Sequence, residues 1–336
     1  MEPNKDVRRW GKSHPTPAHK TILVSTVIPA YNAQAFIARA LRSALAQGIP
    51  ETEIIVVDDG STDATSEIVA RYATQGIRLI SHSAQRGVAA ARNTGIDAAM
   101  GEFIAFLDAD DEWLPGKLQR QLEILRAIPQ MRFISCRAAL IDEYGRDLGD
   151  IYRGALPAVG PEAWRTILTY PCVPTPSVVV RRQALQDAGP FNKWLPVGED
   201  QDMWIRLSLL GEVGHIPDPL VRVHSTPNSL SKANFCDQAS YVLPMITAYV
   251  ARYARRLSVR ERRRILGERF SRMGKSAYAN GEWSFGIKTL LRAVGYGHRP
   301  LGNILYLIRA SGLVRRIKRL IQPKQSRCPI SSGEQG

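Results

Sequence analysis

Three aspartates cluster at the end of a short apolar run. Asp108, Asp110 and Asp111 follow directly on residues 103–107. Carboxylates this close repel one another, so a positive partner is expected among them. Mg²⁺ and Mn²⁺ favour carboxylate oxygens combined with the phosphate oxygens of a substrate. The cluster therefore predicts a divalent cation with a bound diphosphate. The plain alternative is a solvated acidic turn, with Asp111 capping the next helix.

A second acidic group lies in the segment Gly-Glu-Asp-Gln-Asp at 198–202. Glu199, Asp200 and Asp202 follow a glycine at the start of a predicted helix. A carboxylate placed there can remove a proton from a hydroxyl group. Acids in a first helical turn also complement the helix dipole, which would explain one of the three without any catalytic role.

At the ends of two further predicted strands lie residues that could hold a planar nucleobase. Pro29, Ala30 and Tyr31 offer backbone and an aromatic face, and Asp59 offers a carboxylate that can accept a base N–H. The alternatives are a core aromatic for Tyr31 and a turn and helix cap for Asp58 and Asp59.

Three cationic or titratable residues accompany these acids. Arg86 and Arg92 can make forked contacts with phosphate or carboxylate groups, and an ion pair to a neighbouring aspartate is the structural alternative. His224 ends the apparent strand 220–224, where a histidine is usually structural.

The elements that must position these residues alternate between strand and helix. An α/β fold with a doubly wound, mostly parallel sheet is predicted, and its ligands should lie outside the carboxyl ends of the strands. The expected strands are 22–28, 53–57, 77–81, 103–107, 131–141 and 176–181, and the expected helices are 33–47, 65–75, 87–99, one starting at Leu114-Pro115, and 200–210.

Four blocks in this order resemble the inverting family 2 glycosyltransferases of the GT-A fold. The resemblance covers about 22–225, and the blocks are 24–32, 53–65, 86–96 and 103–113. The sequence lacks the Gln-x-x-Arg-Trp block of processive polymerases, so the non-processive bacterial type is expected. A sugar nucleotidyltransferase is one alternative, although a Gly-rich loop should then replace Pro-Ala-Tyr-Asn. A non-catalytic protein that binds nucleotide or glycan is the other.

The resemblance implies roles for the residues already named. It implies a nucleotide-sugar donor, most often UDP-linked, whose base meets Pro29, Ala30, Tyr31 and Asp59. Segment Asp108-Ala109-Asp110 resembles the Asp-x-Asp motif, with Asp108 at ribose or metal and Asp110 at Mn²⁺ or Mg²⁺. By the same resemblance Asp200 is the base, with Glu199 or Asp202 as alternatives. Arg86 and Arg92 shape the nucleotide pocket, and His224 reaches metal or diphosphate.

Charge divides the chain into two parts. Residues 251–336 carry 20 Lys+Arg against 4 Asp+Glu, whereas the whole chain has a net charge of +14. We predict a disordered basic N-terminus (1–20), a GT-A domain (21–235), a helical basic region (236–322) and a disordered tail (323–336). Expected helices of the basic region are 238–256, 260–280, 283–295 and 301–320.

The basic region suggests a partner. Leu305, Ile308, Leu313, Ile317 and Leu320 fall near one side of the last helix, with arginines and lysines elsewhere. Such a helix suits an anionic membrane surface; a solvated helix is the second interpretation, and nucleic acid is not an expected partner. The acceptor would be a glycan or lipid-linked glycan of envelope or exopolysaccharide synthesis.

The cysteines and the hydropathy pattern indicate the compartment. The four cysteines show no metal or redox spacing, and no apolar run reaches the ~18 residues that span a bilayer. We therefore expect reduced thiols and a cytoplasmic protein that is peripheral at the membrane.

Overall fold

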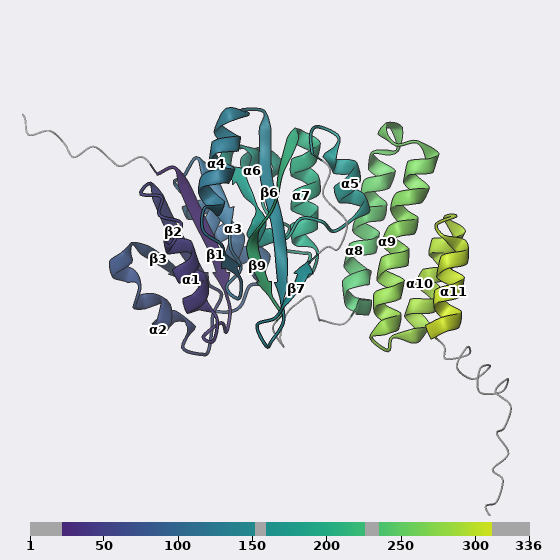
Figure 1. Ribbon diagram of the computed structural model, residues 1–336, viewed down its shortest axis with the longest axis horizontal. Coiled ribbons are helices and arrows are strands. Elements are labelled where there is room, and N and C mark those ends of the chain that lie inside the picture. Colours follow the sequence, from purple (N-terminus) through teal and green to yellow (C-terminus); the bar gives the residue numbers. More distant parts are fainter. Residues whose placement is uncertain (1–21, 152–158, 226–234, 311–336) are drawn as a thin grey trace, which may run out of the picture.

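A computed structural model describes residues 22–151, 159–225 and 235–310 (Figure 1). The expectations for 1–20, for 323–336 and for the part of helix 301–320 beyond residue 310 lie outside these ranges. Within them, nine strands join in one sheet of order β3-β2-β1-β4-β8-β6-β9-β5, with β7 paired to β6.

The first half of the sheet is parallel, as the alternating pattern predicted. Its neighbours pair in the order β3-β2-β1-β4, so the strands all end at one edge. The strands are β1 (Val24–Ala30), β2 (Thr52–Asp58), β3 (Ile77–Ser81) and β4 (Phe103–Phe106). The connections are α1 (Ile37–Leu45), α2 (Thr65–Ala70) with the 3-10 turn η1 (Ala73–Gln75), and α3 (Val88–Ala98).

The second half of the sheet is mixed, so "mostly parallel" describes only the first half. β8 is antiparallel to both β4 and β6, and β9 is parallel to β6. β6 turns directly into β7, and a tight turn can join only antiparallel strands. These strands are β5 (Glu112–Trp113), β6 (Met131–Ile141), β7 (Asp147–Asp150), β8 (Val179–Arg181) and β9 (Glu212–His224).

Helices cover both faces of the sheet because its strands are apolar on both sides. Val24 and Ile28 of β1 belong to one core with α1 and α4 (Lys117–Ala127), while Val27 belongs to the other. The second core also holds α3, α5 (Ala163–Thr169), α6 (Arg182–Ala188) and α7 (Glu199–Leu210). The short 3-10 turn η2 (Thr175–Ser177) precedes β8.

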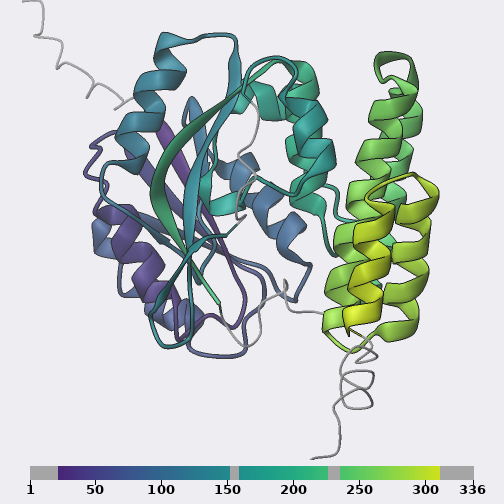
Figure 2. The same ribbon diagram turned by 45° about the vertical axis from the view of Figure 1, so that its right-hand side comes forward.

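The C-terminal helices pack beside this second core (Figure 2). They are α8 (Phe235–Arg252), the 3-10 turn η4 (Ala254–Arg256), α9 (Val259–Ala279), α10 (Trp283–Gly295) and α11 (Pro300–Ala310). Ser258 and Glu261 form a capping box that starts α9. In the part of the chain that the structure describes, no helix is both long enough and apolar enough to cross a bilayer.

Candidate active site

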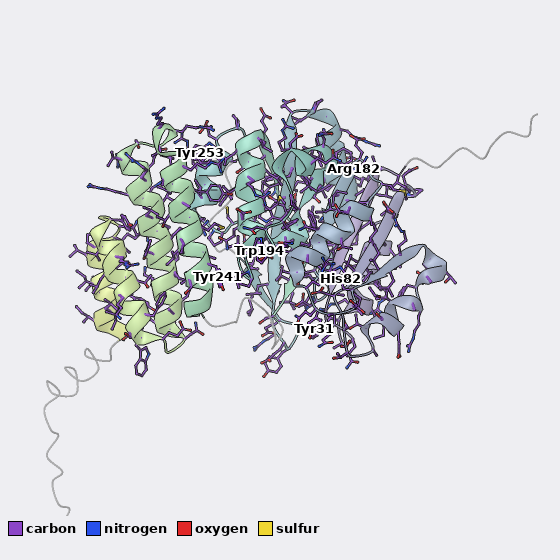
Figure 3. The ribbon with its side chains drawn as sticks, turned by 180° about the vertical axis from the view of Figure 1, so that it is seen from behind. Tyr31, His82, Arg182, Trp194, Tyr241 and Tyr253 are labelled. Carbon is purple, nitrogen blue, oxygen red and sulfur yellow. The ribbon has the colours of Figure 1, made fainter. Side chains whose placement is uncertain are left out.

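The carboxyl ends of the parallel strands carry the predicted donor residues at one edge of the sheet. Pro29 and Ala30 are buried at the end of β1, whereas Tyr31 is 43% exposed just beyond it. Figure 3 shows Tyr31 and His82 near this edge. The alternative that Tyr31 is a core aromatic is therefore wrong, and its ring is accessible to a ligand.

The loops after β1 and β2 are joined by hydrogen bonds to side chains. Asn32, which has a left-handed φ of +47°, accepts from the backbone of Thr62, and its own N–H donates to the Ser61 hydroxyl at 2.9 Å. Asp58 accepts from the Ser61 N–H and from the Ser66 hydroxyl. Asp58 thus stabilises the turn after β2, as its turn interpretation predicted, but it does not cap α2, whose N-cap is Ala64.

Asp59 fixes the loop that leads into α3. Its carboxylate is 3% exposed and accepts from the backbone N–H groups of Arg86 and Gly87 at 3.0 and 2.7 Å. The ring of His82 lies 2.6 Å from the same carboxylate and 2.9 Å from the Thr94 hydroxyl. The expected contact of Asp59 with a nucleobase stays a prediction, since the observed partners are all within the protein.

Helix α3 lies unusually close to β1, and this places Arg92 inside the site. A Cβ on Gly95 would come within 2.4 Å of a Val27 methyl group, so only glycine fits this crossing. Arg92 is 4% exposed and donates to Asp108 at 2.9 Å and to Glu199 at 2.7 Å. One guanidinium thereby joins the donor-side acid after β4 to the acidic start of α7.

Burial and charge shift the pKa values of this cluster. Burial alone would lower the pKa of Arg92, but Asp108 and Glu199 outweigh it and raise that pKa above its ordinary value. Burial, with the charge of Asp200, raises the pKa of Glu199 to about 7 against the opposing effect of Arg92. Burial also raises the pKa of Asp200. Both acids therefore titrate closer to neutrality than free carboxyl groups do.

Asp200 faces the same enclosed region as Arg92. It accepts from the Thr175 hydroxyl at 3.3 Å and from the Gln201 N–H at 2.7 Å. Asp202 points elsewhere, to Arg206 at 2.7 Å and to the Tyr249 hydroxyl at 2.7 Å. Asp202 thus has structural partners away from Thr175, while Glu199 is paired with Arg92.

The predicted metal ligands surround a crowded acidic turn. Among the described residues, no three or more His, Cys, Asp or Glu side chains form a ready metal cage. A cation brought by a diphosphate needs only one or two protein carboxylates, however. Burial and the charges of Asp110 and Asp108 raise the pKa of Asp111 well above its ordinary value, as expected where a cation would relieve the repulsion.

His224 has a ring nitrogen that suits such a cation. Its Nε2 is buried and has no hydrogen-bond partner among the described residues, and it lies 3.6 Å from a Glu112 carboxylate oxygen. Burial and Arg39 lower its pKa, which favours the neutral ring that binds metals. Arg39 itself donates to the backbone carbonyl of Asp110. His224 can therefore offer a free ring nitrogen to a ligand, while the assignment of Asp108, Asp110 and His224 to one divalent cation stays a prediction.

The structure corrects the expectation for Asp111. Asp111 does not cap α4, which begins at Lys117 after Gly116; its carboxylate instead accepts from the His224 N–H at 3.0 Å. The chain continues as β5 after the acidic turn, so the helix starts too late for Asp111 to reach it. Trp204 of α7 is 1% exposed and packs among Phe106, Phe133 and Phe191, so it belongs to the core.

Several site residues were missed from the sequence. His82 directly follows β3. Its position at the end of a strand in the parallel half of the sheet was the signal that could have identified it. Thr175, Tyr249 and Arg269 gave no such signal because each comes from a segment distant in sequence. Arg269 of α9 donates to the Gln201 side chain at 2.8 Å and to the carbonyls of Leu168 and Ile167 at 2.7 Å.

Comparison with solved structures identifies the fold as that of GT-A glycosyltransferases. Staphylococcus aureus TarS 1–349 in complex with UDP-GlcNAc superposes with a TM-score of 0.64 at 20% identity, covering 89% of this chain and 92% of that one. A mannosyltransferase of Pyrobaculum calidifontis, in complex with GDP-Man and Mn²⁺, gives 0.56 at 21% identity, covering 93% and 86%.

Sequence relatives define the family. The model of glycosyl transferase family 2 matches residues 25–148. The amylovoran biosynthesis glycosyltransferase AmsB of Erwinia amylovora is 33% identical over 61% of this chain and 70% of its own length. The chain belongs to glycosyl transferase family 2 and is a glycosyltransferase, which confirms the predicted resemblance.

One further relative matches only in part. The UDP-Glc:alpha-D-GlcNAc-diphosphoundecaprenol beta-1,3-glucosyltransferase WfgD of Escherichia coli is 40% identical over 31% of this chain and 41% of its own length. The chain spans less than half the length of this relative and of some other curated relatives it matches.

Proposed function

We propose that the protein transfers a sugar from a UDP-linked donor to a hydroxyl group of a glycan or lipid-linked glycan, with inversion at the sugar carbon. The observation that carries the proposal is the position of Arg92 between Asp108 and Glu199. It brings the end of β4, where a nucleotide diphosphate should bind, against the helix start that holds the expected base.

The donor side supplies recognition. The exposed ring of Tyr31 and the backbone of Pro29 and Ala30 would hold the uracil, and the loop held by Asp59 would present Arg86 to the diphosphate. The UDP-GlcNAc complex of TarS supports a UDP donor, because that protein shares the fold. Arg92 and Asp108 would border the ribose and phosphates.

A divalent cation, Mn²⁺ or Mg²⁺, would be held by Asp110 with Asp108 and His224. When bound, it would stabilise the negative charge on the departing diphosphate. The Mn²⁺ complex of the Pyrobaculum mannosyltransferase supports this assignment. Ala109 is 8% exposed between the two aspartates, so it would only space them.

Asp200 would act as the base. A single displacement needs a carboxylate that removes the proton of the acceptor hydroxyl as it attacks the sugar carbon. Arg92 and Thr175 hold Asp200 and its neighbour in place, and the raised pKa of Asp200 makes it a better proton acceptor than an exposed aspartate. The Glu199 carboxylate is bound by Arg92, so Glu199 would orient itself and the neighbouring Asp200 rather than accept the proton.

Calorimetric titration of UDP, GDP and dTDP, each with and without Mn²⁺, tests the donor site. We expect UDP to bind only with the metal. The Asp110→Ala variant should lose the metal-dependent part of UDP binding and all turnover while remaining folded. Asp142→Ala, in the exposed β6–β7 turn, is the matched control and should bind UDP normally. Metal-dependent binding that survives Asp110→Ala would overturn the metal assignment.

The acceptor belongs to polysaccharide synthesis in this proposal. Support comes from AmsB, whose name places it in amylovoran biosynthesis, and from WfgD, whose named acceptor is a diphosphoundecaprenol-linked sugar. A sugar nucleotidyltransferase would instead release pyrophosphate, so assaying pyrophosphate against UDP as the released product separates the two reactions.

A lipid-linked acceptor would be met at a membrane surface, and α10 and α11 offer a face for it. Trp283, Ile287 and Leu291 lie at helical spacing on α10 and are 64%, 39% and 55% exposed. Lys288 and Arg292 are exposed beside them. Leu301, Ile304, Leu305 and Ile308 continue the exposed apolar side chains on α11. Apolar side chains next to cations fit an anionic lipid surface.

Flotation of the full chain with vesicles tests this membrane face. We expect binding to vesicles that contain phosphatidylglycerol and little binding to pure phosphatidylcholine. The double variant Ile287→Ser with Leu291→Ser should bind about thirtyfold less or weaker still, since each buried side chain contributes on the order of 1 kcal/mol or more. Met100→Ser, exposed on the catalytic domain, should bind normally; equal binding of all three proteins would overturn the membrane face.

A further inference from the structure

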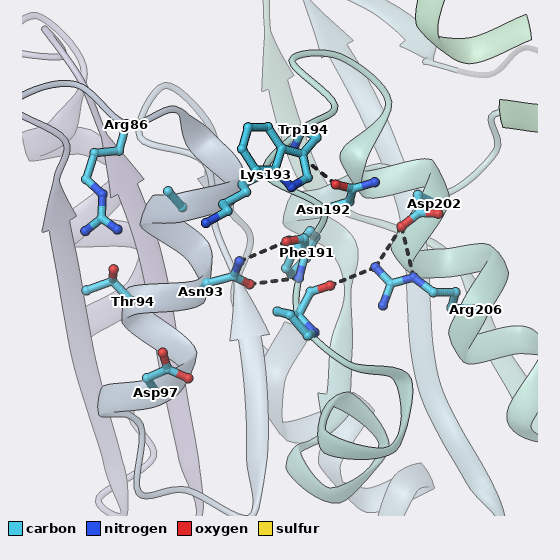
Figure 4. A pocket seen from close by; sticks show the side chains of 12 residues that line it. Arg86, Asn93, Thr94, Asp97, Phe191, Asn192, Lys193, Trp194, Asp202 and Arg206 are labelled. Carbon is cyan, nitrogen blue, oxygen red and sulfur yellow. Dashed lines mark hydrogen bonds and ion pairs between the residues drawn. The ribbon is translucent and has the colours of Figure 1, made fainter. Parts of the chain in front are cut away.

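A groove of about 610 Å³ runs between the outer side of α3 and the loop of residues 190–194 (Figure 4). Arg86 lies at the end of the groove next to the start of α3, and Asp97 lies toward the opposite end. Since the Arg86-Gly87 turn is held by Asp59, this first end borders the donor site.

The loop that forms the other wall is fixed from two sides. The Asn93 side chain donates to the Phe191 carbonyl at 2.9 Å and accepts from the Phe191 N–H at 2.8 Å. Arg206 donates to the carbonyls of Ala188, Gly189 and Pro190 at 2.7, 3.0 and 3.0 Å. The loop backbone is therefore held by α3 and by α7, the helix whose first turn contains Asp200.

This fixed loop presents an indole to solvent. Trp194 is 79% exposed, although its backbone N–H is bound by the Asn192 side chain at 3.0 Å. Lys193 lies 5.3 Å from the centre of the indole ring. Figure 4 places Trp194 and Lys193 at the same end of the groove as Arg86. While the indole of Trp194 is exposed, the protein does not gain the free energy that burying this large apolar surface would provide. A ligand that covers the ring would gain it on binding.

We propose that Trp194 is a stacking platform for a sugar ring of the acceptor, one or more units away from the hydroxyl that reacts. This inference rests on the proposed function and names the acceptor class as a saccharide of at least two units. The apolar C–H face of a pyranose covers an indole, while Lys193 and Asn192 donate to its hydroxyl groups.

Geometry explains why the acceptor must be longer than one sugar. Asp200 faces inward to Thr175 and Arg92, whereas Trp194 stands on the outer surface, four residues before the Gly198 that opens α7. A single sugar at Asp200 leaves the indole uncovered. The platform therefore adds affinity for the acceptor without touching the reacting atoms, so its loss raises the acceptor KM and leaves kcat nearly unchanged.

Saturation-transfer NMR of the full chain with UDP and Mn²⁺ tests the platform. The probes are chitotetraose, cellotetraose, a mannotetraose and a hyaluronan tetrasaccharide at millimolar concentration. We expect at least one to bind, and to bind more tightly than its monosaccharide. Trp194→Ala should weaken that binding by about tenfold or more, equivalent to ~1.4 kcal/mol, and Trp194→Phe should recover part of it.

Tyr144→Ala is the matched control, because Tyr144 is also highly exposed but lies on the β6–β7 turn. It should bind the saccharide as the wild type does, and UDP affinity should be the same in every variant. If UDP binds but no tetrasaccharide does, or if Trp194→Ala binds it normally, the platform is wrong. Failure of the wild type to bind UDP at all would instead overturn the proposed function.

Discussion

The donor edge of the sheet and helix α7, which carries the proposed base, are held in place by different parts of the chain. At the donor edge, the Asp59 carboxylate is bound by residues 82–87, and the loops after β1 and β2 bind each other. The acids at the start of α7 depend on Arg92 of α3, Thr175 before β8, and Arg269 and Tyr249 of the C-terminal helices.

In the proposed function, this difference separates nucleotide recognition from catalysis within one chain. The donor edge is assembled by the parallel half of the sheet, within the region that the family model matches. The start of α7, where the proposed base Asp200 lies, is also held by parts of the chain that follow it, including α8, whose Val242 would lie 2.9 Å from a Cβ on Gly198. Changes in the C-terminal helices should therefore affect turnover more than donor binding.

Asp200→Asn should separate the two regions most clearly. An asparagine keeps the size and the Thr175 contact but cannot accept the proton, so kcat should fall by ~10²-fold or more. UDP affinity, measured by the same calorimetry, should stay within a factor of about two of the wild-type value. Near wild-type turnover would move the base to Glu199 or Asp202 and remove the contrast between the regions.

Arg269→Met tests the support of α7 from the C-terminal helices. The change leaves the buried carbonyls of Leu168 and Ile167 without their donor, which should lower the free energy of unfolding by about 2–4 kcal/mol. Urea denaturation measures this loss. Arg272→Met, on the same helix but 44% exposed and paired to Glu268, should cost less than about 1 kcal/mol.

The acid pair on α7 should give the protein a pH-dependent stability. The pKa of Glu199 is about 7 in the fold against an ordinary value of 4.5, so the folded state holds more protons between these values. The contribution of Glu199 to the free energy of unfolding should be largest below about pH 4.5. It should fall as the pH rises through 7, by at most ~1.4 kcal/mol per pH unit.

Urea denaturation across pH 5–8 isolates that contribution by comparison with Glu199→Gln. The glutamine still accepts from Arg92 but cannot titrate, so the difference between the two proteins should change over this range and level off above about pH 7. Curves that stay parallel would show that Glu199 keeps one charge state throughout and that burial does not govern it.

Tyr249→Phe should have the smallest effect. It removes the hydroxyl that donates to Asp202, which still accepts from Arg206, so the loss should be about 1 kcal/mol. Tyr241→Phe, on the same helix but 41% exposed, should be neutral within ~0.5 kcal/mol. Equal effects of the two changes would argue against a specific link from α8 to α7.

The sequence by itself determined the parallel half of the sheet and most of the residues at its edge. Apolar runs that end in Asp58 and Asp108 indicated buried strands. Because the carboxyl ends of parallel strands lie at one edge of a sheet, these aspartates were expected there together. The small residues of α3 likewise predicted a helix, and Gly95 shows why they are needed. These features depend on local pattern, which a chain displays directly.

Only the tertiary structure decided which partners those residues have. The antiparallel pairing of β8 and the link through Arg92 bring together residues about one hundred positions apart. The same holds for the bracing of α7 by Arg269 and the rigid exposure of Trp194. Such contacts follow from the packing of whole layers, and no short pattern in the chain encodes a partner at that separation.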